Sequence, residues 1–199
     1  MKFTEYLNES NSSSTKVQPR DVGELRIIIL DTVKEKGLDC DLNFIDTSKI
    51  TDMSLLFKRS ELQGFNGDIS KWNTSNVKNM ECMFMNSYFN GDISKWDTSK
   101  VETMESMFAD SHFKGDISSW DVSKVEDMNS MFEGSDFNGD ISRWTPKKLR
   151  YADRMFTKSK FNRDLSKWRL SKKIFGTIVE DMFKFSPLED KEEFWPKKV

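Results

Sequence analysis

Cysteine and long apolar runs are scarce in this sequence, and each scarcity removes a class of protein. Only two cysteines, Cys40 and Cys82, occur among 199 residues, so the sequence does not indicate a disulfide-stabilised secreted fold. No run of about 18 apolar residues occurs, and residues 1–20 lack the apolar stretch of a signal peptide. We therefore expect a cytoplasmic protein with no disulfide and no membrane association.

Histidine is nearly absent as well, which bears on catalysis. The single histidine is His112, and the chain has no phosphate-binding loop, dinucleotide fingerprint or Cys/His metal-ligand spacing. Any Ser/His or Cys/His catalytic set would have to be built on this one residue. At the equivalent position of other copies of the repeat described below it is replaced by Tyr88, Asp136 and Lys160, a variety typical of a surface loop. The sequence predicts a non-enzymatic protein without a cofactor.

The chain instead has an internal repeat, whose period is the interval from Trp72 to Trp96. Its unit reads F-N-G-D-I-S-K-W-D-T-S-K-V-x-x-M-x-x-M-F-x-x-S-x, with four copies in register over residues 65–160, a further copy from Phe161 and an earlier one at residues 41–57. A fixed period of this length is typical of a solenoid, in which each unit buries its apolar side against its neighbours. Tryptophan recurs once in each regular copy: Trp72, Trp96, Trp120, Trp144 and Trp168.

The two halves of each unit predict different structures. Val101, Met104, Met107 and Phe108 have the spacing of one face of a short helix, and residues 97–99 offer capping oxygens before it. Residues 93–96 are expected to be a short extended segment that pairs in parallel with the next copy. The predicted fold is α/β: six coils, each with one short strand and one short helix.

Non-repetitive segments flank the repeats. Residues 1–20 are expected to form a flexible lead, and residues 21–40 a helical cap whose helix starts after Asp21 and stops at Gly37. The solenoid itself is expected to span residues 41–185. Residues 186–199 are predicted to cover its last coil through Phe194 and Trp195, because the open end of a stack needs a lid.

The segment FNGDISKWDTSKVETMESMF resembles the units of BspA-like leucine-rich repeats, which read close to NGDISNWDVSNVTDMSYMF. The resemblance covers residues 41–185 and implies a right-handed leucine-rich-repeat solenoid that binds proteins, often on bacterial or protist surfaces. Similar repeats occur in large tailed bacteriophages, and the opening MKFTEYLNES is similar in style to short phage proteins. A phage-encoded protein that binds a host protein, to block or to recruit it, is therefore one expectation.

Two repeated side chains each have two interpretations. The tryptophans could be exposed platforms for sugars or bases, but five exposed indoles would form a large apolar patch, which favours a buried ladder. A row of six aspartates (Asp41, Asp68, Asp92, Asp116, Asp140 and Asp164) could collect Ca²⁺. In four copies the aspartate follows a glycine, which favours an aspartate that accepts hydrogen bonds in a turn. We expect no metal site.

Charge is unevenly distributed along the chain. Residues 41–144 carry a net charge of −8 and residues 145–175 a net charge of +9. Such a run is either a solvated face or a docking surface for a partner of opposite pattern. The second interpretation predicts a protein-interaction module, and its alternatives are nucleic-acid binding through the basic end or a surface adhesin; the oligomeric state stays open. The predicted partner-binding residues are Lys147, Lys148, Arg150, Arg154, Lys158, Lys160, Arg163, Lys167 and Arg169.

Overall fold

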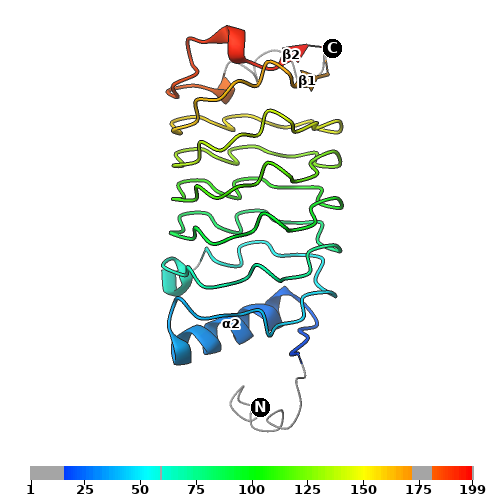
Figure 1. The fold of residues 1–199 in the computed structure, drawn as a ribbon, viewed down its shortest axis with the longest axis vertical. Coiled ribbons are helices and arrows are strands. Elements are labelled where there is room, and N and C mark those ends of the chain that lie inside the picture. The colour runs from blue at the N-terminus through cyan, green and yellow to red at the C-terminus, as the bar shows by residue number, and fades with distance from the viewer. Residues whose placement is uncertain (1–15, 59, 172–180, 199) are drawn as a thin grey trace.

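The 24-residue units lie one on another along the long axis of the molecule (Figure 1). The computed structural model describes residues 16–58, 60–171 and 181–198. We number the units 1 to 6, over residues 41–64, 65–88, 89–112, 113–136, 137–160 and 161–185. Equivalent side chains of neighbouring units touch: the rings of Trp96 and Trp120 are 6.5 Å apart and nearly parallel.

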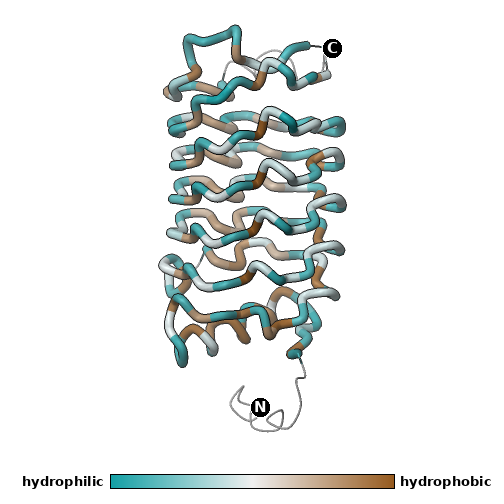
Figure 2. Tube along the Cα trace, viewed as in Figure 1, coloured by the Kyte–Doolittle hydropathy of each residue, from teal (hydrophilic) through white to brown (hydrophobic). Residues whose placement is uncertain are grey.

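The interior of the stack is aromatic. Each regular unit contributes one tryptophan and two phenylalanines, and every one of these rings is at most 4 % exposed. The rings stack between neighbouring units, as Phe84 of unit 2 does on two rings of unit 3, Phe89 at 4.5 Å and Phe108 at 5.6 Å. Apolar segments alternate with polar ones around every coil (Figure 2). The prediction of a buried tryptophan ladder is confirmed.

Turns occupy the second half of units 1 to 5, where the sequence predicted a short helix. Ser106 and Asp110 have φ angles of 52° and 53°, and this left-handed conformation interrupts a right-handed helix. Alternate N–H groups donate to the next unit instead: Ser106 to the Asn129 carbonyl at 2.8 Å, and Phe108 to that of Met131 at 2.9 Å. The helix-like apolar spacing therefore comes from successive tight turns that direct these side chains inward.

The parallel pairing also lies in the second half of the units. Isolated parallel bridges join Asp52, Asn79, Thr103, Asp127 and Tyr151 in succession. The extended strand predicted at residues 93–96 is absent from the described residues, where the two strands are β1 (Arg169–Leu170) and β2 (Lys197–Lys198), paired in parallel. The right-handed sense of the stack and its place among leucine-rich repeats stay predictions.

A helix closes the N-terminal end, as the sequence predicts. Helix α2 spans Val22–Lys36, with the Asp21 carboxylate accepting a hydrogen bond from the N–H of Glu24. Gly37 ends it at a φ of 88° and donates its N–H to the carbonyl of Val33. The buried face of α2 covers unit 1 through five residues: Leu25, Ile28, Ile29, Thr32 and Val33.

The predicted lead is partly built into the fold. Val17 pairs in parallel with Ile45, its N–H donating to Phe44 and its carbonyl accepting from Asp46. Gln18 reaches the Asp46 carboxylate at 2.7 Å. The ordered lead thus adds a strand-like edge beside unit 1, whereas the rest of the predicted flexible segment, residues 1–15, lies outside the described residues.

The C-terminal residues fold back over unit 6. The 3-10 helix η2 (Glu192–Phe194) ends where the Phe194 carbonyl accepts the N–H of Leu165 at 2.8 Å. The Trp195 ring stacks on Phe183 at 5.4 Å, and β2 pairs with β1. The predicted contact of Phe194 and Trp195 with the last coil is confirmed. A second 3-10 helix, η1 (Ser60–Leu62), lies in the longer loop of unit 1.

Candidate functional site

The nine basic residues predicted to bind a partner are all exposed, yet they do not form one patch. Equivalent residues of neighbouring units stack on each other, so one repeat unit makes one circuit of the coil. Residues 147–169 span almost one full circuit, and the basic side chains are therefore distributed around the stack as a belt. We call these nine residues the basic belt; they are Lys147, Lys148, Arg150, Arg154, Lys158, Lys160, Arg163, Lys167 and Arg169.

Three members of the basic belt pair with acidic residues of unit 4. Arg150 lies 3.5 Å from Glu126, Arg154 contacts Glu133 and Lys160 contacts Asp136. The opposite charges of the two neighbouring units thus face each other within the molecule. The contrast between an acidic stack and a basic end, which suggested a docking partner, is in part satisfied inside the protein.

The other belt residues divide into two kinds. Arg163 donates to the Asn138 carbonyl at 3.0 Å, and Arg169 donates to the Ser166 carbonyl at 2.8 Å, so both guanidinium groups are tied to the backbone. Four lysines make no ion pair with any part of the chain that the structure describes: Lys147, Lys148, Lys158 and Lys167. Lys147 and Lys148, adjacent in sequence, form the densest free positive charge of the belt.

The aspartate row serves turns, as predicted. In each regular unit the carboxylate accepts the N–H of the serine two residues on, at 2.9 Å for Asp92 and Ser94. These hydrogen bonds hold the pKa of each of these carboxyls below its usual value. A second row of aspartates makes the same turn: Asp97, for instance, accepts the N–H of Ser99. Within the described residues no three His, Cys, Asp or Glu side chains are placed to hold a metal ion.

The position of His112 is more connected than its variable sequence suggested. Its ring stacks on Tyr88 at 4.7 Å and lies 2.8 Å from Asp136, whose carboxylate also contacts Lys160. Hydrogen bonds from Lys160 and then His112 lower the pKa of Asp136 to about 2. Four consecutive units are thus linked on the surface, which sequence reasoning missed because it treated the four side chains as unrelated.

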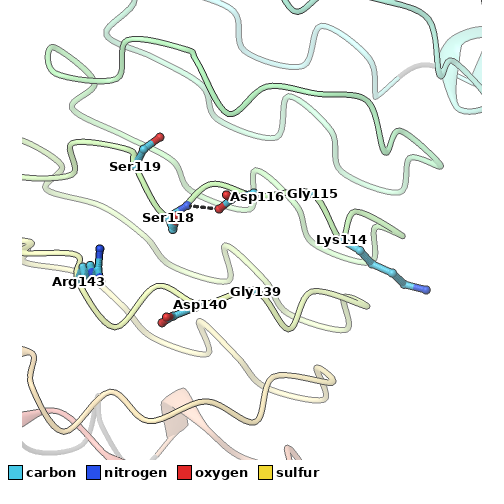
Figure 3. Close-up of a pocket in the computed structure, with 8 residues that line it drawn as sticks. All are labelled: Lys114, Gly115, Asp116, Ser118, Ser119, Gly139, Asp140 and Arg143. Carbon is cyan, nitrogen blue, oxygen red and sulfur yellow. Dashed lines mark hydrogen bonds between the residues drawn. The ribbon is translucent and has the colours of Figure 1, made fainter.

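An open groove of about 570 Å³ lies between units 4 and 5. Asp116, Ser118 and Ser119 line it from unit 4, and Asp140 and Arg143 from unit 5 (Figure 3). The sequence analysis did not predict this groove. Beside it a short side chain, Ser119, stands where the other regular units have a lysine or an arginine.

Two further observations concern the cysteines and the helices. Cys40 and Cys82 are both buried and unpaired, and burial raises the pKa of each thiol. Over residues 16–58, 60–171 and 181–198, no helix is long and apolar enough to cross a membrane.

Comparison with known proteins identifies a repeat family. Residues 31–134 and, in an overlapping second match, residues 88–192 fit the family described as "Mycoplasma protein of unknown function, DUF285". A search of the curated proteins and a search of the solved structures each found no match. The two matches together cover most of the chain, including every unit of the stack, and the chain therefore belongs to the DUF285 family.

Proposed function

We propose that this protein is a non-catalytic protein-interaction module built on a right-handed solenoid of BspA-like leucine-rich repeats. The support is architectural. The side chains that recur in the regular units have structural roles: the indole rings pack in the core, and the carboxylates accept hydrogen bonds in turns. The side chains that vary lie outside, on a rigid stack whose two ends are covered. Such a stack presents a stable surface on which small changes define a partner.

The pair Lys147 and Lys148 carries the proposal. Their ammonium groups stay exposed and without an ion pair among the described residues, while Arg150 and Arg154 beside them are held by unit 4. The free charges are thereby kept on a firmly anchored segment. An acidic surface of a partner protein fits this edge, and charge complementarity there speeds the encounter and orients it.

The cytoplasm is the compartment in which we place this interaction, with a host protein as the partner if the gene is phage-borne. The belt geometry argues against nucleic acid as the principal ligand. A nucleic-acid site gathers several cations along one track so that they contact successive phosphates, whereas the free lysines here are spread around a full circuit. The adhesin alternative has no contact among the described residues that favours it.

The test compares two double variants of equal charge change. Lys147→Glu with Lys148→Glu alters the proposed edge, and Lys71→Glu with Lys95→Glu alters units 2 and 3. Each protein is used to capture partners from lysate of the native cells. We expect one set of proteins to be retained by wild type and by the Lys71/Lys95 variant and lost with the Lys147/Lys148 variant. Equal capture by all three proteins would exclude this edge.

A nucleic-acid arm completes the test. Fluorescence anisotropy with a 20-base-pair duplex is measured at 50 and 200 mM salt. A phosphate-binding protein with 6–10 contacts loses about 10³–10⁵ in affinity over that range, and such a loss would favour the nucleic-acid reading over the protein partner. We expect no measurable binding of the duplex at either salt concentration.

A further inference from the structure

The groove between units 4 and 5 arises from two departures of unit 4 from the repeat. Where the unit reads FNGDISKW, unit 4 reads FKGDISSW, so that Lys114 replaces asparagine and Ser119 replaces lysine. Ser119 belongs to a row that is otherwise basic: Lys71, Lys95, Arg143 and Lys167. Its short side chain turns towards unit 3, where the hydroxyl donates to the Ser94 carbonyl at 2.8 Å. Unit 4 therefore lacks a long basic side chain where the groove lies.

The missing cation leaves one carboxylate in an unusual setting. In the other regular units the basic residue lowers the pKa of its own aspartate, as Lys71 does for Asp68 and Lys95 for Asp92. Hydrogen bonds from Ser118 lower the pKa of Asp116, but the charges that act on it are the carboxylates of Asp92 and Asp140, which oppose that shift. Asp116 thus lies in the row without the cation that its neighbours have.

The cations that line the groove are engaged elsewhere. The Lys114 ammonium lies 3.7 Å from Asp136, and Figure 3 shows its side chain directed away from Asp116. Arg143 belongs to the next unit, where it acts on Asp140. Among the described residues the Asp116 carboxylate is hydrogen-bonded by Ser118, whose N–H donates to Oδ1 at 2.9 Å and whose hydroxyl contributes as well. Asp116 forms no ion pair with a cation of the described part of the chain.

From this arrangement we propose that the groove receives the side chain of one arginine or lysine from a partner protein, which takes the place of the absent lysine and pairs with Asp116. The proposal rests on the proposed protein-interaction function and adds a second contact to it. An arginine fits best, because its planar guanidinium can donate two parallel hydrogen bonds to the carboxylate of Asp116. The partner thus combines an acidic surface for Lys147 and Lys148 with a projecting basic residue.

The geometry favours a side chain over a metal ion. Metal sites of hard cations gather about six or more oxygens, and among the described residues no such cluster is found. The groove is instead open, and it lies where Ser119 interrupts a row of basic residues. At the equivalent position the other regular units have a chain of methylenes with a terminal cation.

The experiment uses N-acetyl-arginine amide as the probe and the full chain as the receptor. Backbone amide shifts of Gly115, Ser118 and Ser119 are followed in ¹H–¹⁵N spectra at 50 mM salt. We expect saturable shift changes with the arginine amide and none with N-acetyl-citrulline amide, which has the same shape without the charge. Spermidine is added in a separate titration, to separate a free polyamine from a protein side chain.

Three variants make the result decisive. Ser119→Lys restores the repeat and fills the groove, and Asp116→Asn removes the charge but keeps the turn, since Asn73 makes the same kind of turn to Ser75. Both should abolish the shift changes. Asp92→Asn, the matched change one unit away, should leave them intact. Because Ser119→Lys installs the residue found in units 2 and 3, it should fold at least as stably as the wild type.

Any one of three results would overturn the proposal: unchanged arginine binding in Ser119→Lys, equal shift changes with the citrulline amide, or shift changes with spermidine alone. This test does not depend on Lys147 and Lys148. If the groove binds arginine while the Lys147/Lys148 variant still captures every partner, the proposed edge is refuted and the proposed arginine site stands.

Discussion

The indole N–H of Trp120 donates a 3.1 Å hydrogen bond to the carbonyl of Ile93 in the preceding unit. The same bond recurs for Trp96, Trp144 and Trp168 at 3.0–3.2 Å. The tryptophan thus joins two units in two ways, through ring stacking and through a polar contact in a place from which water is excluded. A buried indole nitrogen needs such a partner, and a carbonyl left without one is costly.

Replacement of Trp120 by alanine should lower the free energy of unfolding by about 3–5 kcal/mol, because a large buried ring is removed and a cavity remains. Trp120→Phe keeps most of the apolar contact and loses only the indole hydrogen bond, because the Ile93 carbonyl still accepts the N–H of Trp96 at 3.2 Å; it should cost about 1 kcal/mol. Urea denaturation followed by circular dichroism measures both. Trp195→Ala, in the partly buried cover, should cost clearly less; equal losses at positions 120 and 195 would contradict the assigned burial.

The pH dependence of stability should contain a contribution from Asp136. Its pKa of about 2 lies below the usual value, so the folded state favours the ionised form. The stabilisation is fully present above pH ~4 and is lost as the pH falls towards about 2. Screening by solvent at the exposed partners reduces it to about 1 kcal/mol. Wild type and Asp136→Asn should differ by this amount at pH 6 and converge near pH 2; a constant difference would refute the assignment.

Neither cysteine should form a disulfide within the monomer, and both should react slowly. The thiols are buried and their pKa values are raised by loss of solvation, so little thiolate exists near neutral pH. Reaction with Ellman's reagent at pH 7.5 should be at least about tenfold slower than that of glutathione, and should become fast in guanidinium chloride. Recovery of a Cys40–Cys82 cross-linked peptide from freshly purified monomer would disprove the first statement.

Chelation should leave the protein unaffected. In the regular units the aspartate row is occupied by backbone N–H groups of the following serines, which supply the partners that a cation would otherwise supply. The thermal midpoint measured by differential scanning fluorimetry should therefore be the same with and without 5 mM EDTA, with the buffer ionic strength matched. A fall that added Ca²⁺ reverses would establish a metal ladder in place of the turns.

The stacking of units and the content of the core could be predicted from residue identities alone. A large aromatic side chain that recurs at a fixed interval, as Trp120 does, is expected to be buried. The path of the chain through each unit could not be predicted so well. Ser106 adopts a left-handed conformation, which serine does not indicate in a sequence. A second row of left-handed residues is easier to recognise, because Asn86, Asp110 and Gly134 are residue types that tolerate positive φ.

The candidate sites were harder to predict for a different reason. The basic belt was correctly expected on the surface, but Arg154 pairs with Glu133, which lies in the preceding unit and in another row. Such diagonal contacts depend on side-chain reach, which a column-by-column comparison does not contain. The groove, by contrast, leaves a trace in the sequence, because Ser119 is the one short side chain in a row that is otherwise basic; its spatial consequence follows only from the structure.

The hydrogen bonds between units join residues that are close along the chain, as Met104 and Asp127 are at 2.9 Å. No contact between described residues requires the two ends of the polypeptide to meet, so the entropy of closing long loops hardly enters, and assembly can begin at any unit and spread in both directions. Loss or gain of one whole unit leaves every remaining interface of the same kind. The chain can therefore change its length in steps of one unit, and with it the extent of its surface. A unit also tolerates a longer loop, since Phe57 and Phe84 stack at 5.3 Å although more residues separate them than the regular repeat has.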